Sequence, residues 1–192
     1  MPVVANNASA LDGVVTEAGN NDNGTVVSGT ATASATLSAS DVDTGATQIW
    51  SLVGKPVSTY GVMSIDSETG KWTYMLDNTL AATQALKEGD VETQTYTARV
   101  TDDKEAYVNQ TITITINGTN DSPVVVADTN NTSENAALTV TAANGLLAND
   151  TDPDTGATHA VSAVNGLTEK VGTAVSGGTV DIYVYGTDFT AF

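Results

Sequence analysis

An aspartate-rich heptapeptide occurs twice in the chain. Residues 41–47 read Asp-Val-Asp-Thr-Gly-Ala-Thr, and residues 152–158 read Asp-Pro-Asp-Thr-Gly-Ala-Thr. An Asp-x-Asp pair on an extended loop can direct two carboxylates at one ion, and the following Thr-Gly lets the backbone turn and offer carbonyl oxygens, which are ligands that Ca²⁺ prefers. The alternative is a turn without a metal, because aspartate is a good turn residue. We predict that both pairs bind calcium: Asp41, Asp43, Asp152 and Asp154.

The repetition extends beyond the heptapeptide. When its two copies are aligned without gaps, Trp72 and Tyr74 correspond to Tyr183 and Tyr185. Several matches at one spacing indicate two related structural units in tandem. An aromatic-rich strand at this position is predicted to pack in the core, with a carbohydrate platform as the alternative.

Three segments follow from the repeat. We predict a first unit over residues 1–118, a linker over residues 119–122 and a second unit over residues 123–192. The second unit has no counterpart of residues 82–118, which carry the last two strong strand patterns of the first. We therefore expect a second unit that is truncated, partly disordered or completed by a strand from another chain.

The elements that must position the aspartates are strands. Residues 111–116 alternate Thr and Ile, and residues 30–39 and 95–101 also alternate between apolar and polar side chains. Threonine occurs 32 times in 192 residues, whereas helix-favouring residues are scarce. Residues 79–87 alone have a helical pattern. These features predict an all-β protein built from β-sandwiches.

Charge and composition exclude several classes of protein. The chain has 23 acidic and 6 basic residues and a net charge of −17, which disfavours nucleic acids and anionic membranes as partners. No apolar run is long enough to span a bilayer. There is no cysteine, and the one histidine, His159, is predicted to be a solvated loop residue. We expect no enzymatic activity, because the acidic residues are spaced as cation ligands and lack a supporting nucleophile or base.

Several motifs together resemble a known family. Around the first heptapeptide, the chain resembles a VCBS repeat in the following segments: residues 41–45, 60–66, 70–78, 84–89, 101–103 and 114–121. Residues 120–123 and 146–154 are similar to the related bacterial cadherin-like repeats. The resemblance implies tandem immunoglobulin-like or cadherin-like β-sandwiches, the second incomplete here, as found in large secreted adhesins, often of the RTX type.

The resemblance also implies where calcium binds, because cadherin-like arrays hold ions between consecutive modules. The implied ligands at the junction of the two units are Glu17, Glu88 or Asp90, Asn120, Asp121, Asp152 and Asp154. At the opposite end of the first unit, the implied half-site comprises Asp41, Asp43 and either Asp102 or Asp103. A preceding module would complete that half-site.

The function that we expect is structural. The chain is predicted to be a calcium-rigidified repeat of an extracellular bacterial adhesin that acts in cell adhesion or biofilm formation, secreted or at the cell surface, with neighbouring repeats as its partners. Two alternatives remain open: a carbohydrate-binding module that grips a glycan or another cell-surface ligand, and a fibre subunit that exchanges strands with other copies.

Overall fold

The chain is almost entirely β-structure. Its computed structural model describes residues 1–6, 10–21, 24–131, 138, 140–164 and 182–186. Apart from the 3₁₀ turn η2 (Ala142–Asn144), the named elements in these residues are strands, so the all-β prediction is confirmed. No helix in the described part of the chain has the length and apolarity needed to cross a lipid bilayer.

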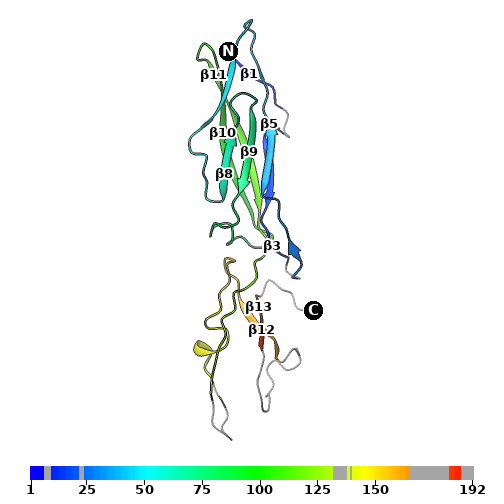
Figure 1. Ribbon diagram of the computed structural model, residues 1–192, viewed down its shortest axis with the longest axis vertical. Helices are drawn as coiled ribbons and strands as arrows, with labels where there is room; N and C mark the ends of the chain where they lie inside the picture. The colour runs from blue at the N-terminus through cyan, green and yellow to red at the C-terminus, as the bar shows by residue number, and fades with distance from the viewer. Residues whose placement is uncertain (7–9, 22–23, 132–137, 139, 165–181, 187–192) are drawn as a thin grey trace.

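A four-stranded sheet forms one layer of the first unit (Figure 1). In spatial order, its strands are β2 (Asp12–Thr16), β11 (Tyr107–Asn117), β10 (Val91–Asp102) and β7 (Gln48–Val53). The central strand β10 is antiparallel to both β11 and β7, whereas β2 runs parallel to β11. Because β2 and β11 are parallel, both continue towards the same end of the unit, where the second unit begins.

A three-stranded sheet forms the other layer. Its strands are β5 (Thr32–Thr36), β9 (Lys71–Leu76) and β8 (Gly61–Ile65), and both pairings are antiparallel. Two short pairs lie at the ends of the unit: β1 (Val3–Val4) with β6 (Ala39–Ser40), and β3 (Gly19–Asn20) with β4 (Val26–Val27).

The core lies between the two layers. Ile112, Ile114 and Ile116 alternate inwards along β11 and are fully buried, as their period of two predicts. From β9, Trp72 and Tyr74 enter the same core and are 1% and 0% exposed. Both rings therefore pack in the core as expected, and neither is available there as a surface platform for a sugar.

Residues 79–87 do not form a helix, which corrects the helical expectation. The segment folds as successive turns, in which Thr83 N–H and Gln84 N–H both donate to Leu80 O, at 3.0 and 3.1 Å. Nine residues gain little from helical hydrogen bonding on their own. Leu86, which is only 6% exposed, packs into the core instead and ties this turn segment to the end of the first unit.

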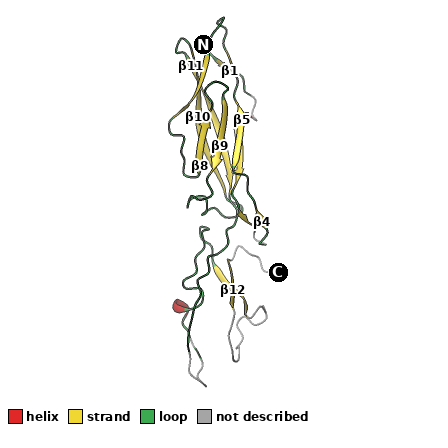
Figure 2. Ribbon diagram, in the orientation of Figure 1, coloured by secondary structure: helices red, strands yellow, loops and turns green. Residues whose placement is uncertain are grey.

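The second unit follows the first along the long axis of the molecule (Figure 2). Its described strands are β12 (His159–Val164) and β13 (Ile182–Gly186), which pair antiparallel, and loops make up most of its remaining described part. Completion by a partner's strand concerns residues 165–181 and 187–192, which lie outside the described residues. That expectation and the unit boundaries at 118 and 123 therefore stay predictions.

The core makes a direct prediction about stability. Replacing Ile112 with alanine removes a fully buried side chain and should lower the free energy of unfolding by about 2–5 kcal/mol. The adjacent Thr111 is exposed on the other face of β11, so Thr111→Ala serves as the matched control and should cost well under about 1 kcal/mol. Urea denaturation followed by tryptophan fluorescence measures both, and equal losses would contradict the assignment of faces.

Candidate metal centre

The two heptapeptides fold into the same loop. In the first, Asp43 N–H donates to Asp41 Oδ1 at 3.0 Å; in the second, Asp154 N–H donates to Asp152 Oδ1, also at 3.0 Å. Each loop is thus closed by an aspartate side chain that accepts from the backbone two residues on. Sequence repetition here reflects repeated structure, and in each loop the backbone holds the first of the two carboxylates in place.

Glycine is required in both loops for its backbone conformation. Gly45 and Gly156 have φ values of 78° and 79°, in the left-handed region that favours glycine. A Cβ at either position would meet no atom within 4 Å, so conformation and not space selects glycine there. The Thr-Gly that follows each Asp-x-Asp therefore makes the turn that the motif predicted.

Glu17 is buried at the end of the first unit that faces the second. It follows β2 directly and is 0% exposed. Its Oε2 accepts from Thr119 N–H at 3.3 Å, and its Oε1 accepts from the side-chain amide of Gln84 at 3.2 Å. The sequence-predicted ligand is therefore positioned by the linker on one side and by the turn segment 79–87 on the other.

The environment of Glu17 opposes its negative charge. Burial raises its pKa to about 8, and the nearby charges of Asp121 and Asp154 add to the rise, against the hydrogen bonds from Thr119 and Gln84. A carboxylate this strongly disfavoured near neutral pH is either protonated or neutralised by a cation.

The second heptapeptide reaches the same place from the second unit. Asp121 N–H, in the linker, donates to Asp154 Oδ2 at 2.8 Å, and Thr155 N–H donates to Ala85 O at 3.1 Å. Asp154 is only 4% exposed. Burial raises the pKa of Asp121 to about 6, and the charge of Asp152 contributes. Carboxylates from the first unit, the linker and the second unit thus share one partly buried junction.

The linker residue Asn120 completes the junction on the side of β3. It is 2% exposed, and its side-chain nitrogen has no hydrogen-bond partner among the described residues. Its carbonyl oxygen accepts from Asn20 N–H at 2.6 Å. A Cβ on Gly19 would lie 2.6 Å from that oxygen and 2.5 Å from Thr119 Oγ1, so β3 can approach the linker this closely only with glycine there.

The donor set of the junction suits a hard cation. Its groups are carboxylate and amide oxygens: Glu17, Asn120, Asp121, Asp152 and Asp154. Among the described residues, no three His, Cys, Asp or Glu side chains are arranged to hold a metal ion as they stand. Coordination would therefore require the amide of Asn120, backbone carbonyls and adjustment of the carboxylates.

At the opposite end of the first unit, three aspartates of the predicted half-site, Asp41, Asp43 and Asp102, lie around a positive charge. The amino group of Met1 lies 3.3 Å from Asp41 Oδ2, 3.9 Å from Asp43 Oδ2 and 3.7 Å from Asp102 Oδ2. The side chains of Asp41 and Asp102 are only 3% and 2% exposed. In this chain, the three carboxylates therefore already converge on one cationic group.

Asp103, Glu88 and Asp90 are the remaining predicted ligands, and they stay predictions. Asp103 pairs with Lys104 at 2.6 Å instead of joining Asp102 in the cluster around Met1. Glu88 is exposed, and Asp90 uses its side chain to accept from Lys87 N–H at 3.3 Å.

His159 corrects a prediction. Instead of a solvated loop residue, it begins β12; its side chain is 16% exposed, and its Nε2 lies 3.8 Å from Asp152 Oδ2. It follows the heptapeptide directly, and strand formation turns it back towards the loop.

Asp150 is a buried carboxylate that the sequence analysis did not single out: it is 8% exposed, and its Oδ1 accepts from Val126 N–H at 2.8 Å. Its place two residues before Asp152 was the available signal.

Comparisons with known proteins find only a distant structural likeness. No protein family model matches the chain, and no curated protein matches it. Among solved structures, the chain is similar to the crystal structure of Drosophila N-cadherin EC1-4, with 16% identity and a TM-score of 0.36. That likeness covers 65% of this chain, which spans only 27% of the cadherin chain. It is too distant to carry an argument about function.

The raised pKa of Glu17 predicts a pH dependence in metal-free protein. The folded chain retains the proton on Glu17 up to about pH 8, whereas the unfolded chain releases it near 4.5. The free energy of unfolding in EDTA should therefore fall as pH rises between those values. Asp121, whose folded-state pKa is about 6, adds a fall of the same sign that levels off above that pH.

The variant Glu17→Gln isolates this effect, because the amide keeps the shape of the side chain without its charge. Above pH 6, the difference in stability between wild type and variant should shift steadily in favour of the variant as pH rises to about 8. Denaturant titrations in EDTA at a series of pH values measure it. Parallel curves over this range would contradict the buried, proton-binding state of Glu17.

Proposed function

We propose that the chain is a calcium-binding structural repeat of an extracellular bacterial adhesin, and that calcium stiffens the joint between its two units. The observation that carries the proposal is the junction, where buried carboxylates from both units and the linker meet. Glu17 is 0% and Asp154 4% exposed, and the charge of Asp154 helps to raise the pKa of Glu17. A site of this kind is costly to assemble unless a cation neutralises it.

The residues that would hold the ion are Glu17, Asn120, Asp121, Asp152 and Asp154. A bound Ca²⁺ supplies positive charge and accepts roughly six to eight oxygen ligands in a flexible arrangement. Glu17 would then remain ionised at neutral pH, and Asp121 and Asp154 would be held together through more than their one backbone hydrogen bond at 2.8 Å. The linker would lose its freedom to bend, which gives the joint its stiffness.

The role that follows is mechanical and non-enzymatic. Stiff joints between repeats would hold a distal binding domain away from the cell surface, in adhesion or biofilm formation. Neighbouring repeats are the proposed partners, and the cluster of Asp41, Asp43 and Asp102 is the proposed half-site for a preceding repeat. The chain's resemblance to VCBS and bacterial cadherin-like repeats supports this role, as does its net charge of −17, which calcium would partly neutralise.

Calcium should raise the melting temperature. Extracellular modules bind Ca²⁺ with dissociation constants of about 0.1–1 mM. At about 10 mM free Ca²⁺, linkage then predicts a stabilisation of about 1.4–2.7 kcal/mol relative to EDTA. Thermal melting followed by circular dichroism measures this, with NaCl at equal ionic strength as the control for general screening. Identical melts in calcium and EDTA would refute the calcium proposal.

Neutralising the second heptapeptide should loosen the joint without unfolding the first unit. The variant Asp152→Asn with Asp154→Asn removes two junction carboxylates, whereas the core around Ile112 and Ile116 is untouched. In calcium, small-angle scattering should show a wider range of shapes than wild type, and the far-UV spectrum should be nearly unchanged.

The other loop offers a matched control. Asp41→Asn with Asp43→Asn changes a loop of the same conformation at the far end of the first unit, and it should leave the distribution of shapes as in wild type. The assignment of the junction fails if both double variants broaden the distribution equally. It also fails if the first unit melts cooperatively on loss of Asp152 and Asp154.

A further inference from the structure

Strand β10 extends beyond its partner on one side. It runs from Val91 to Asp102, but β7 pairs with it only from Thr97 to Asp102. On the side away from β11, residues 91–96 therefore have no neighbouring strand. Most of them are exposed, so this stretch is an open sheet edge next to solvent.

The backbone groups along this edge alternate in direction. Gly118 N–H donates to Asp90 O at 3.0 Å, at the start of the ladder between β10 and β11. In an antiparallel ladder, alternate residues turn their N–H and C=O groups to opposite sides. The groups of Val91, Thr93 and Thr95 consequently point away from β11, towards the open side.

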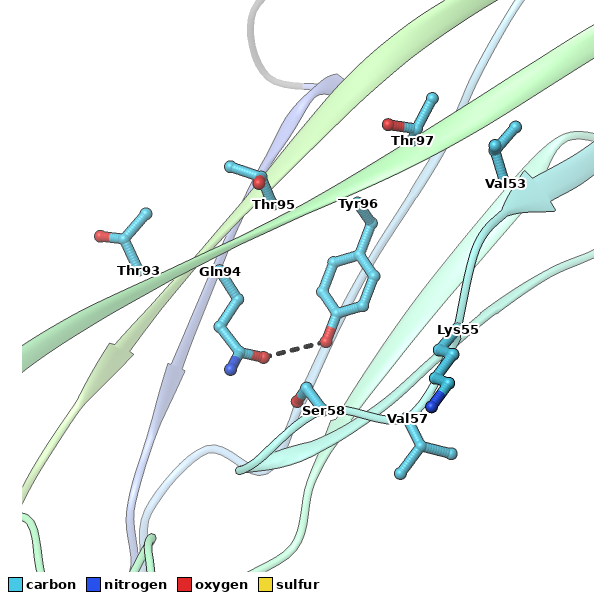
Figure 3. A pocket seen from close by; sticks show the side chains of 9 residues that line it. All are labelled: Val53, Lys55, Val57, Ser58, Thr93, Gln94, Thr95, Tyr96 and Thr97. Atoms are coloured by element: carbon cyan, nitrogen blue, oxygen red, sulfur yellow. Dashed lines mark hydrogen bonds between the residues drawn. The ribbon is translucent and has the colours of Figure 1, made fainter.

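A groove of about 420 Å³ follows the same edge. Residues 93–97 of β10 line one side, and the other side is lined by Val53, Lys55, Val57 and Ser58, as Figure 3 shows. The groove stays open because the chain leaves the sheet at Gly54, whose φ is 95°. Beyond it, Val57 bridges to Val62 of β8, so this segment follows the other sheet.

The side chains in the groove offer hydrogen-bond donors. Tyr96 Oη–H donates to Gln94 Oε1 at 2.9 Å, which leaves the Gln94 amide nitrogen available as a donor. Lys55 makes no salt bridge within the described residues. In Figure 3, the side chains of Gln94, Tyr96 and Lys55 lie on the same side of β10. An amide N–H₂ and an ammonium group together suit a carboxylate.

We propose that this groove binds an extended peptide segment that carries an acidic side chain, added as a strand along residues 91–96. The open N–H and C=O groups of Thr93 and Thr95 would pair with the peptide backbone, as in other cases of strand addition. Its carboxylate would meet Lys55 and Gln94, and the exposed side chains of Val53 and Val57 would cover an apolar neighbour. A glycan has no backbone that could match the strand spacing, so the open edge favours a peptide.

Two synthetic peptides test the proposal on the full ¹⁵N-labelled chain. The first is acetyl-Thr-Val-Glu-Val-Thr-Val-amide, and the second replaces its Glu with Gln. Titration of the first should shift the amide signals of residues 91–96 and slow hydrogen exchange at Thr93 and Thr95. The Gln peptide should bind about two- to fivefold more weakly, because an exposed ion pair contributes little more than that.

Variants of two exposed lysines separate the charge effect from general attraction. Lys55→Gln should abolish the preference for the Glu peptide, whereas Lys71→Gln, on β9, should leave the preference as in wild type. Neither substitution touches the core. If both variants lose the preference equally, the carboxylate does not bind at Lys55 and the proposal is wrong.

A third peptide, N-methylated at every residue, carries the same glutamate but has no backbone N–H on either edge and cannot add as a strand. It should leave hydrogen exchange at Thr93 and Thr95 unchanged. The proposal is overturned if this peptide binds as well as the first, or if oligogalacturonate produces the same shifts with equal affinity, since either result means that a carboxylate alone is recognised. It is also overturned if neither unmethylated peptide shifts these signals at millimolar concentration.

Discussion

The electrostatic cost of burying carboxylates is the main constraint on the junction between the two units. Glu17, Asp121 and Asp154 come from three parts of the chain, and hydrogen bonds from Thr119 to Glu17 and from Asp121 to Asp154 hold them at the junction. Thr119 of the linker, Gln84 of the turn segment and Asp154 of the second unit all lie around Glu17.

The same loop serves two surroundings. Around Asp41 and Asp43, the neighbouring third carboxylate, Asp102, comes from the first unit itself. Around Asp152 and Asp154, the loop contacts the linker and the neighbouring unit instead. The same loop conformation, set by an aspartate side chain and a glycine, therefore contacts different groups depending on its position in the chain.

Much of the fold could be predicted because the first unit is a sandwich with one buried face per strand. The alternation of Ile112, Ile114 and Ile116 determines which face is buried, whatever the partner strands are. Residues 79–87 were misjudged because the local pattern is helical, whereas the burial of Leu86 is a tertiary effect that no local pattern contains. Gln84 reaches Glu17 only through the folding of a distant segment, so its neighbours in sequence carried no signal, whereas His159 directly follows the second heptapeptide.

The parallel pairing of β2 with β11 determines how the first unit carries load. β2 lies near the beginning of the unit and β11 at its end, yet five residue pairs, from Asp12 with Thr113 to Thr16 with Asn117, hold them side by side. When the two ends of the unit are drawn apart along its long axis, these strands slide past one another instead of peeling open. Their hydrogen bonds are then strained together in shear, so the unit resists extension through backbone bonds that must break at nearly the same moment.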